Sequence, residues 1–212
     1  MQLIYSPTSP YARKVRMLVI EKGLTDRVEV VVANPLQDPP ELLAANPLAK
    51  VPALIVEPHV EPHVEPGGGP GFTLFDSPLL CAYLDSLCVP RLIPEAGPER
   101  WQVLRREALA DGITDAAVSS VMEGRRIESQ RSPEWLARWR SAILRGVVEL
   151  EKEAEVLGAR FDLGAIASAA ALAYLDFRLP QIDWRAQAPG LSAWFEGVCS
   201  RESFAATVPP AA

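Results

Sequence analysis

The sequence predicts a small α/β domain followed by an all-α domain, and three observations lead to this prediction. Short runs rich in β-branched and aromatic residues occur only before residue 76. Residues 88–98 contain three prolines and one glycine, a composition typical of a linker. Beyond residue 98, apolar residues recur at helical spacing. We therefore expect an α/β domain at residues 1–87, a linker at 88–98 and an all-α domain at 99–212.

Length and composition are those of a compact cytoplasmic protein. The chain has 212 residues, of which 49% are hydrophobic, so it can bury a sizeable core. Its formal net charge of −6 does not favour nucleic acid as a partner. No segment reads as a leader or approaches the roughly 18 apolar residues of a membrane span. The three cysteines lack metal-like spacing, which argues against a disulfide framework and a zinc site.

The first elements read as strand, turn and helix. Residues 2–5 form a plausible strand, and a turn then delivers the chain to a helix over residues 11–22. Ser9 is a favoured N-cap and Pro10 a favoured first helical residue. A second β-rich run at 28–32 follows. Two strands separated by such a helix imply a right-handed crossover with parallel pairing.

The run at residues 50–56 organises the rest of the domain. It reads as a buried strand that opens at Pro52, where no ladder donor is needed. A cis peptide bond before Pro52 is a hypothesis, because only a minority of such bonds are cis. It would turn the Val51 backbone outward and leave its N–H and C=O free for an extended peptide.

A proline-rich repeat then interrupts what would otherwise be a tight hairpin. Residues 57–66 repeat every fourth residue and three glycines follow, so a mobile loop is favoured over a metal site at His59 and His63. Residues 72–75 read as the next strand. Asp76 and Ser77 precede a helix that runs to about residue 87.

The second half reads as a helical bundle without strands. The predicted helices are residues 99–126, 133–155, 163–179 and 191–200.

Three motifs give the chain a resemblance to the cytosolic glutathione S-transferase family. They are SPYARKV at residues 9–15, NPLAKVPAL at 46–54 and FDSPLL at 75–80, supported by AYLDFR at 173–178 and RESF at 201–204. The resemblance covers nearly the full length and is closest to small bacterial members. It implies a thioredoxin-like N-terminal domain with a cis-proline at Pro52, a helical C-terminal domain whose groove accepts an electrophile, and a homodimer.

By this resemblance, Ser9 is the residue expected to hold the glutathione sulfur. An unperturbed thiol is only roughly 3% ionised at pH 7, and lowering its pKa by about two units requires roughly 2.7 kcal/mol. A hydroxyl donor to a charged acceptor contributes about 1.5–3 kcal/mol and a helix N-terminus about 0.3–1 kcal/mol. Ser9 supplies both, so no metal is required. The alternative is that Ser9 is only an N-cap. Tyr5 is a second hydroxyl, more simply read as a core residue.

The remaining glutathione contacts follow from the ligand's chemistry. Val51 would pair with the cysteinyl backbone as in β-augmentation. Asp76 would meet the α-amino group, and Ser77, at a helix start, the γ-glutamyl carboxylate. Lys50 approaches the glycyl carboxylate or is simply solvated. Arg13 steers an anionic ligand or lies on the outer face of its helix.

The helical domain offers weaker signals. Glu107, Asp111 and Asp115 lie four residues apart, and we favour an ordinary solvated face. Trp101, Val118 and Met122 are equally consistent with substrate contact and with core packing.

The start of the predicted helix at residue 163 departs from the family. Family members often place a reciprocal capping box there, with an acid where Ala165 stands. Asp162 still satisfies one amide, so we expect the helix to form without the second bond.

These features predict a glutathione transferase that conjugates the glutathione thiolate to a small hydrophobic electrophile, a detoxification activity. Glutathione would be a co-substrate, with no cofactor or metal. A non-catalytic binding or stress-associated protein with the same fold is the alternative. A thiol–disulfide oxidoreductase is disfavoured, because Ser9 occupies the position of the required cysteine.

Overall fold

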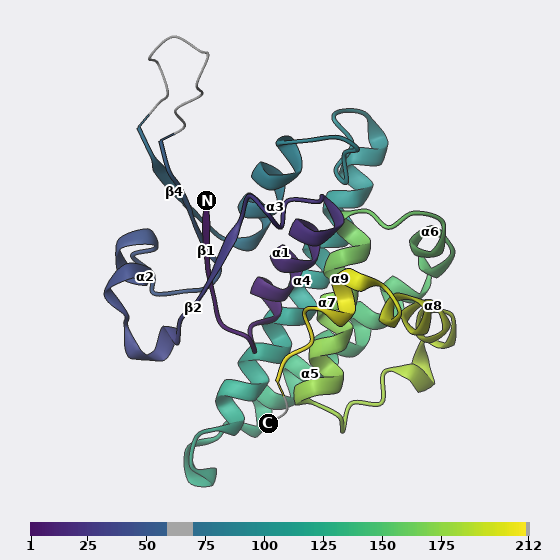
Figure 1. Ribbon diagram of the computed structural model, residues 1–212. Helices are drawn as coiled ribbons and strands as arrows, with labels where there is room; N and C mark the ends of the chain where they lie inside the picture. Colours follow the sequence, from purple (N-terminus) through teal and green to yellow (C-terminus); the bar gives the residue numbers. More distant parts are fainter. Residues whose placement is uncertain (59–69, 211–212) are drawn as a thin grey trace. The chain divides into compact units, whose positions relative to one another are not determined.

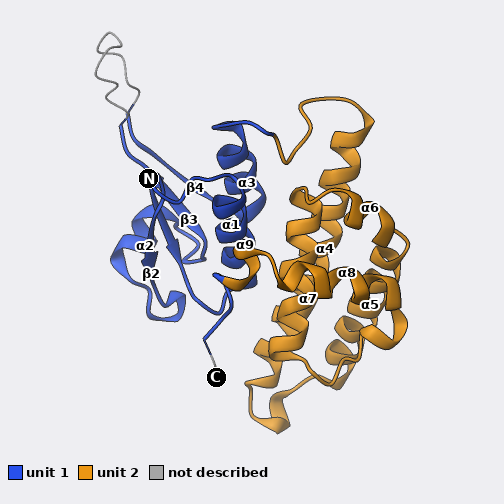
Figure 2. Ribbon diagram, turned by 45° about the vertical axis from the view of Figure 1, so that its right-hand side comes forward, with its two compact units in different colours: residues 1–90, 206–212 blue, residues 91–205 orange. Residues whose placement is uncertain are grey.

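The computed structural model describes residues 1–58 and 70–210, which form two compact units. Unit 1 comprises Met1–Pro90 and the chain from Ala206 onward, and unit 2 comprises Arg91–Ala205 (Figure 2). The division near residue 90 falls in the predicted linker. The C-terminal tail differs from the sequence-based boundaries, because it returns to unit 1 instead of remaining with the helices.

Unit 1 is built on a four-stranded mixed sheet in the order β2-β1-β3-β4 (Figure 1). Its strands are β1 (Gln2–Tyr5), β2 (Glu29–Val32), β3 (Ala53–Val56) and β4 (Phe72–Phe75). As the sequence predicts, β1 and β2 pair in parallel, whereas β3 pairs antiparallel with both β1 and β4. The helices of unit 1 are α1 (Pro10–Glu21), α2 (Pro40–Ala45) and α3 (Ser77–Ser86), with a 3₁₀ turn at Pro35–Gln37. This is the predicted thioredoxin-like arrangement.

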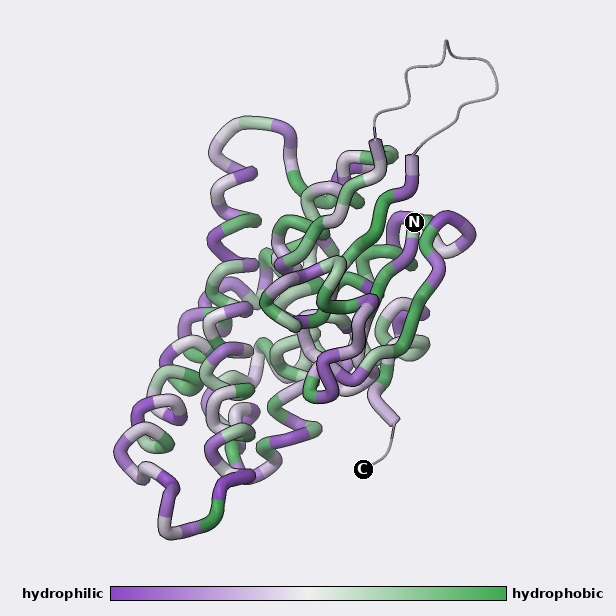
Figure 3. Tube along the Cα trace, turned by 90° about the vertical axis from the view of Figure 1, so that its left-hand side faces the viewer, coloured by the Kyte–Doolittle hydropathy of each residue, from purple (hydrophilic) through white to green (hydrophobic). Residues whose placement is uncertain are grey.

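Apolar burial explains why the central strands and α1 form. Leu3 and Leu54 are cross-strand partners with no exposed surface, and Val15 and Leu18 on α1 are equally buried. Hydrophobic and hydrophilic residues alternate along the helices, which is the pattern of elements buried on one face (Figure 3). The core therefore occupies the faces of the sheet, and the ends of the sheet with their adjoining turns lie outside it.

Unit 2 is helical throughout the residues that the structure describes. Its helices are α4 (Pro98–Gly124), α5 (Pro133–Glu151), α6 (Ala154–Ala159), α7 (Leu163–Arg178), α8 (Pro189–Cys199) and α9 (Glu202–Ala205), with 3₁₀ turns at Glu128–Gln130 and Arg185–Gln187. The sequence predicted one helix over 133–155, but the chain turns at residues 152–153 and begins α6. No described helix has the length and apolar character needed to cross a membrane.

Helix α7 is the buried axis of unit 2, and its start is held by charge. Asp162 Oδ1 accepts a hydrogen bond from Ala165 N–H at 3.0 Å, which confirms the predicted single cap. Arg106 Nη1 lies 3.1 Å from Asp162 Oδ2, and its Nε donates to Glu153 Oε2 at 2.7 Å. A Cβ on Gly164 would stand 2.8 Å from Arg106 Cβ. Glycine therefore lets α4 and α7 approach closely here.

One expectation for α4 is wrong, and one alternative that the sequence left open is decided for two residues. Glu107 is only 3% exposed, so the three acidic residues do not share a solvated face. Trp101 and Met122 are exposed, which rules out core packing for both. Helical spacing shows which residues share a face, but the face that is buried depends on how α5 and α7 pack.

Candidate functional site

The strand register gathers three junctions at one end of the unit 1 sheet. Ile4 pairs with Ala53, and Ala53 pairs with Phe75. Because both pairings are antiparallel, the chain leaving β1, the chain entering β3 and the chain leaving β4 meet at the same end. These junctions hold Ser9, Val51 and Asp76-Ser77. The fold thus brings the sequence-predicted residues of this unit to one edge.

Ser9 is the N-cap of α1. Its Oγ accepts a hydrogen bond from Ala12 N–H at 3.2 Å, and its own backbone N–H donates to Ser6 O at 3.0 Å. Ser9 is therefore an N-cap, as the alternative interpretation of this residue states. A hydroxyl both accepts and donates, so this cap leaves the Ser9 O–H proton available to an anion. The side chain is half-buried at the start of a helix that is 12 residues long.

The peptide bond between Val51 and Pro52 is cis, in agreement with the hypothesis from the sequence. Within the described residues, neither the Val51 N–H nor its C=O has a hydrogen-bond partner. The edge that an extended peptide would need is thus unpaired.

Asn46 holds the loop that leads to Val51, and sequence reasoning missed this role. Its side chain is 2% exposed, donates from Nδ2 to Lys50 O at 2.8 Å and accepts from Leu48 N–H at 3.0 Å. The sequence signal for this role was a short polar residue that directly follows α2 and precedes Pro47. Asn46 therefore fixes the peptide plane preceding Val51.

Asp76 and Ser77 begin α3 with unusual geometry. Asp76 has φ 78° and ψ 121°, a conformation that non-glycine residues rarely adopt, and its side chain makes no capping hydrogen bond. Ser77 is 2% exposed, and its Oγ is fully enclosed without a hydrogen-bond partner. Buried hydroxyls normally find a partner. Here the exposed Asp76 carboxylate and the Ser77 hydroxyl are both uncommitted at a helix N-terminus.

The other predicted residues divide between surface and interior. Lys50 is exposed and makes no ion pair with the described residues. Tyr5 is 8% exposed, with the Arg16 guanidinium 4.6 Å from its ring centroid, as expected of a core residue. Arg13 is buried and donates from Nε to Thr207 Oγ1 at 3.4 Å. Of the two alternatives for Arg13, the outer face of α1 is therefore wrong, because the C-terminal tail covers the side chain.

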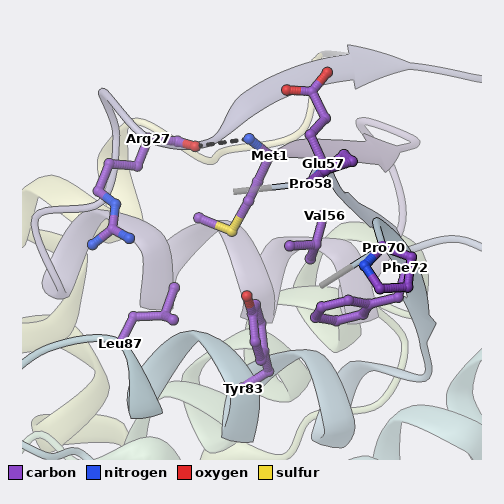
Figure 4. Close-up of a pocket in the computed structure, with 9 residues that line it drawn as sticks. All are labelled: Met1, Arg27, Val56, Glu57, Pro58, Pro70, Phe72, Tyr83 and Leu87. Atoms are coloured by element: carbon purple, nitrogen blue, oxygen red, sulfur yellow. Dashed lines mark hydrogen bonds between the residues drawn. The ribbon is translucent and has the colours of Figure 1, made fainter. Parts of the chain in front are cut away.

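A hollow lies at the opposite end of the same strands. It measures about 540 Å³ and lies where β3 ends at Val56 and β4 begins at Phe72. Figure 4 shows the Tyr83 hydroxyl pointing into it, with Arg27 and Glu57 at its margins. The rings of Phe72 and Tyr83 pack edge to face, with their centroids 5.7 Å apart. This hollow is separate from the junctions that hold Ser9, Val51 and Ser77.

Metal ligands do not gather among the described residues. No group of three or more histidine, cysteine or acidic side chains is placed to hold an ion there. His59 and His63, the pair considered as metal ligands, lie in residues 59–69, outside the described residues. Most of the predicted mobile loop lies there too.

Comparison with known families gives two matches. Residues 8–87 match the family model described as glutathione S-transferase, N-terminal domain, and residues 133–197 match glutathione S-transferase, C-terminal domain. A curated protein of Escherichia coli (strain K12), described as "Uncharacterized GST-like protein YibF", is 37% identical over 216 residues, with all of both chains covered.

Solved structures agree with these matches. A glutathione transferase family member from Pseudomonas fluorescens Pf-5 with bound glutathione has a TM-score of 0.88 at 38% identity, covering 99% of this chain and 98% of its own. A Pf-5 family member was also solved with S-(propanoic acid)-glutathione, with a TM-score of 0.84 at 38% identity over 99% and 100% of the two chains. A glutathione S-transferase from Methylobacillus flagellatus KT with glutathione bound has a TM-score of 0.81 at 36% identity, covering 99% of each chain.

Proposed function

Since this chain belongs to the glutathione S-transferase family, we propose that unit 1 binds glutathione and that the protein transfers its thiolate to a small hydrophobic electrophile. The buried, unpartnered Ser77 Oγ is the observation that supports this most strongly. An enclosed hydroxyl without a partner costs about 1–3 kcal/mol, and a bound carboxylate would remove that cost.

Each uncommitted group suits one part of the tripeptide. The Ser77 hydroxyl and the N-terminus of α3 suit the γ-glutamyl carboxylate, and Asp76 suits the adjacent α-amino group. The unpaired Val51 backbone suits the cysteinyl N–H and C=O, as a strand added to an edge. Lys50 is the cation available to the glycyl carboxylate.

Ser9 would activate the thiol by donating its O–H to the sulfur while it keeps its cap. The donor and the α1 N-terminus together contribute about 2–4 kcal/mol, enough for the two-unit pKa shift that makes most of the bound thiol ionised at pH 7. The thiol proton leaves to solvent. The thiolate then forms the C–S bond, and a leaving group such as halide departs with its electron pair.

Relatives support alkyl or aryl transfer to the thiol. The Pseudomonas fluorescens and Methylobacillus flagellatus proteins are described with glutathione bound, and one Pseudomonas complex holds a glutathione that carries propanoic acid on sulfur. The last ligand is a thioether, the class of product that this reaction yields. A cytoplasmic homodimer belongs to the same proposal, and analytical ultracentrifugation tests the dimer.

A non-catalytic binding protein is the second candidate, because the Ser9 Oγ has a structural use as a cap that needs no thiol. The experiment that separates the two measures thiolate absorbance of bound glutathione against pH, together with turnover of a model aryl halide. Ser9→Ala should raise the pKa of the bound thiol by at least about one unit and lower turnover about tenfold or more. Thr8→Ala is the matched hydroxyl control. Unchanged thiol pKa and turnover in Ser9→Ala would remove Ser9 from the mechanism.

A further inference from the structure

Helix α7 carries, near its end, a tyrosine that is mostly buried and whose hydroxyl has no hydrogen-bond partner among the described residues. Tyr174 is only 7% exposed, and no described residue forms a hydrogen bond with its hydroxyl. The oxygen is not among the fully enclosed polar atoms that lack a partner, so it reaches the surface of unit 2. A tyrosine with a buried ring and a hydroxyl at the surface presents a hydrogen-bond donor beside apolar surface, which suits a ligand that has both characters.

Arg178 lies on the same face of α7, one turn after Tyr174. Residues four apart on a helix are neighbours, and the Arg178 guanidinium lies 4.0 Å from the Phe177 ring centroid. Within the described residues it has no carboxylate partner. Two other arginines of unit 2 do have carboxylate partners: Arg106 pairs with Asp162 and Arg185 with Asp176.

Arg125 adds a second unpaired guanidinium at the same end of the unit. Arg106, in the third turn of α4, lies against Gly164, in the first turn of α7, and the two helices pack along their lengths. The charge of Arg125 also acts on Tyr174 near the end of α7, so the C-terminal turns of the two helices lie at the same end. Arg125 directly follows α4, and its Nη1 lies 3.6 Å from Met122 Sδ, with no carboxylate partner among the described residues.

The electrostatic setting keeps the tyrosine a neutral donor. Burial raises the pKa of Tyr174 above its ordinary value, and the positive charges of Arg178 and Arg125 oppose this only in part. A protonated hydroxyl within electrostatic reach of two guanidiniums complements a carboxylate, since arginine and tyrosine both donate to carboxylate oxygens. The exposed Met122 and the Phe177 ring supply apolar surface beside these donors.

We infer that Tyr174, Arg178 and Arg125 form an anion site in the helical unit that binds the carboxylate of a small amphipathic organic acid. This inference rests on the proposed function in one respect: where the helical domain accepts the electrophile, that electrophile carries a carboxylate. It narrows the expected substrate from a hydrophobic electrophile to an apolar acid.

Both arginines also lie at helix C-termini, where a cation stabilises the helix dipole by about 0.3–1 kcal/mol. That structural role predicts lower stability for their variants and no preference for acids. Ligand binding therefore separates the two roles, and stability does not.

The test is calorimetric titration of the full chain, without glutathione, with hydrocinnamate and with its neutral amide. The anion site predicts that the acid binds at least about tenfold more tightly than the amide. Arg178→Gln and Arg125→Gln should each weaken binding of the acid about fivefold or more and leave that of the amide unchanged. Tyr174→Phe should weaken the acid about threefold or more. Arg126→Gln, an adjacent exposed arginine that donates to Gln130 O, is the control and should bind as the wild type does.

Three results would overturn the inference: equal binding of acid and amide, no saturable binding of hydrocinnamate by folded wild-type chain, or wild-type affinity in both arginine variants. Circular dichroism of each variant separates lost binding from lost structure. Arg178→Lys, a charge-preserving replacement, serves the same purpose. A parallel glutathione titration distinguishes the two proposals. A chain that binds glutathione and not hydrocinnamate overturns the anion site alone, whereas binding of hydrocinnamate and not glutathione overturns the proposed function alone.

Discussion

The start of α7 in unit 2 and the strand ends of unit 1 use their polar groups in opposite ways. In unit 2, Arg106 is 3% exposed and satisfied by Glu153 and Asp162, and Asp176 accepts from both Trp184 Nε1 and Arg185. In unit 1, the enclosed Ser77 Oγ and the Val51 backbone have no partner among the described residues. Saturated groups hold helices together, while unsatisfied groups cost stability and are expected where a ligand completes them.

The difference follows from the local architecture. Arg106 lies within a packed helix and meets side chains from neighbouring elements, whereas Val51 and Ser77 lie at turns between a strand and the next element. At such junctions the backbone leaves its ladder and exposes N–H and C=O groups. Site and scaffold can thus be told apart by which polar groups are left uncommitted.

The largest effect should come from breaking the saturated network. Arg106→Ala leaves the Asp162 and Glu153 carboxylates without their shared cation, so we expect a loss of about 3–5 kcal/mol in the free energy of unfolding. Urea denaturation measures it. Arg105→Ala, whose side chain is 54% exposed, is the matched control and should cost about 1 kcal/mol or less. Equal losses in the two variants would contradict the importance of burial.

Asn46→Ala should have the next largest effect, and it should act on both stability and binding. Two hydrogen bonds to a buried amide are lost, which costs about 1–3 kcal/mol in unfolding free energy. Because the Lys50 carbonyl is released, glutathione affinity should also fall about threefold or more. Asn34→Ala, which removes an exposed bond to Leu36 N–H, should leave glutathione affinity unchanged. Wild-type glutathione affinity in Asn46→Ala would show that the loop leading to Val51 keeps its conformation without the Asn46 side chain.

The smallest effect should come from an exposed pair in unit 2. A hydrogen bond and the positive charge of Lys152, with help from Arg105, lower the pKa of the Glu149 carboxyl below its ordinary value of 4.5. A depressed folded-state pKa contributes stability above the unfolded pKa, and this is lost as pH falls through the folded value. Glu149→Gln should therefore be slightly less stable than the wild type at pH 7, with the gap closing below about pH 4. Thermal melts of the two proteins at pH 7 and below about pH 4 measure this difference in stability. A difference that widens in acid would contradict the predicted direction.

The sequence predicted local structure better than it predicted partners. The strands at residues 2–5 and 72–75 and the parallel crossover follow from β-propensity, turn residues and chirality, all of which are local. The break at residues 152–153, the tail over Arg13 and the burial of Glu107 depend on contacts between distant segments, which periodicity does not contain. Within the candidate site, Ser9, Val51 and Ser77 were proposed from motifs, and they stay predictions. The missing partner of Ser77 Oγ became visible only once α3 was packed.

Calorimetric titration of the chain and of Ser77→Ala with glutathione isolates the role of the enclosed hydroxyl, because that hydroxyl has no hydrogen-bond partner among the described residues to lose. We expect saturable binding of glutathione to the wild type and at least about tenfold weaker binding to Ser77→Ala, with an unfolding free energy equal to or above that of the wild type. Equal affinity in the two chains, or a variant that loses stability and not affinity, would contradict it.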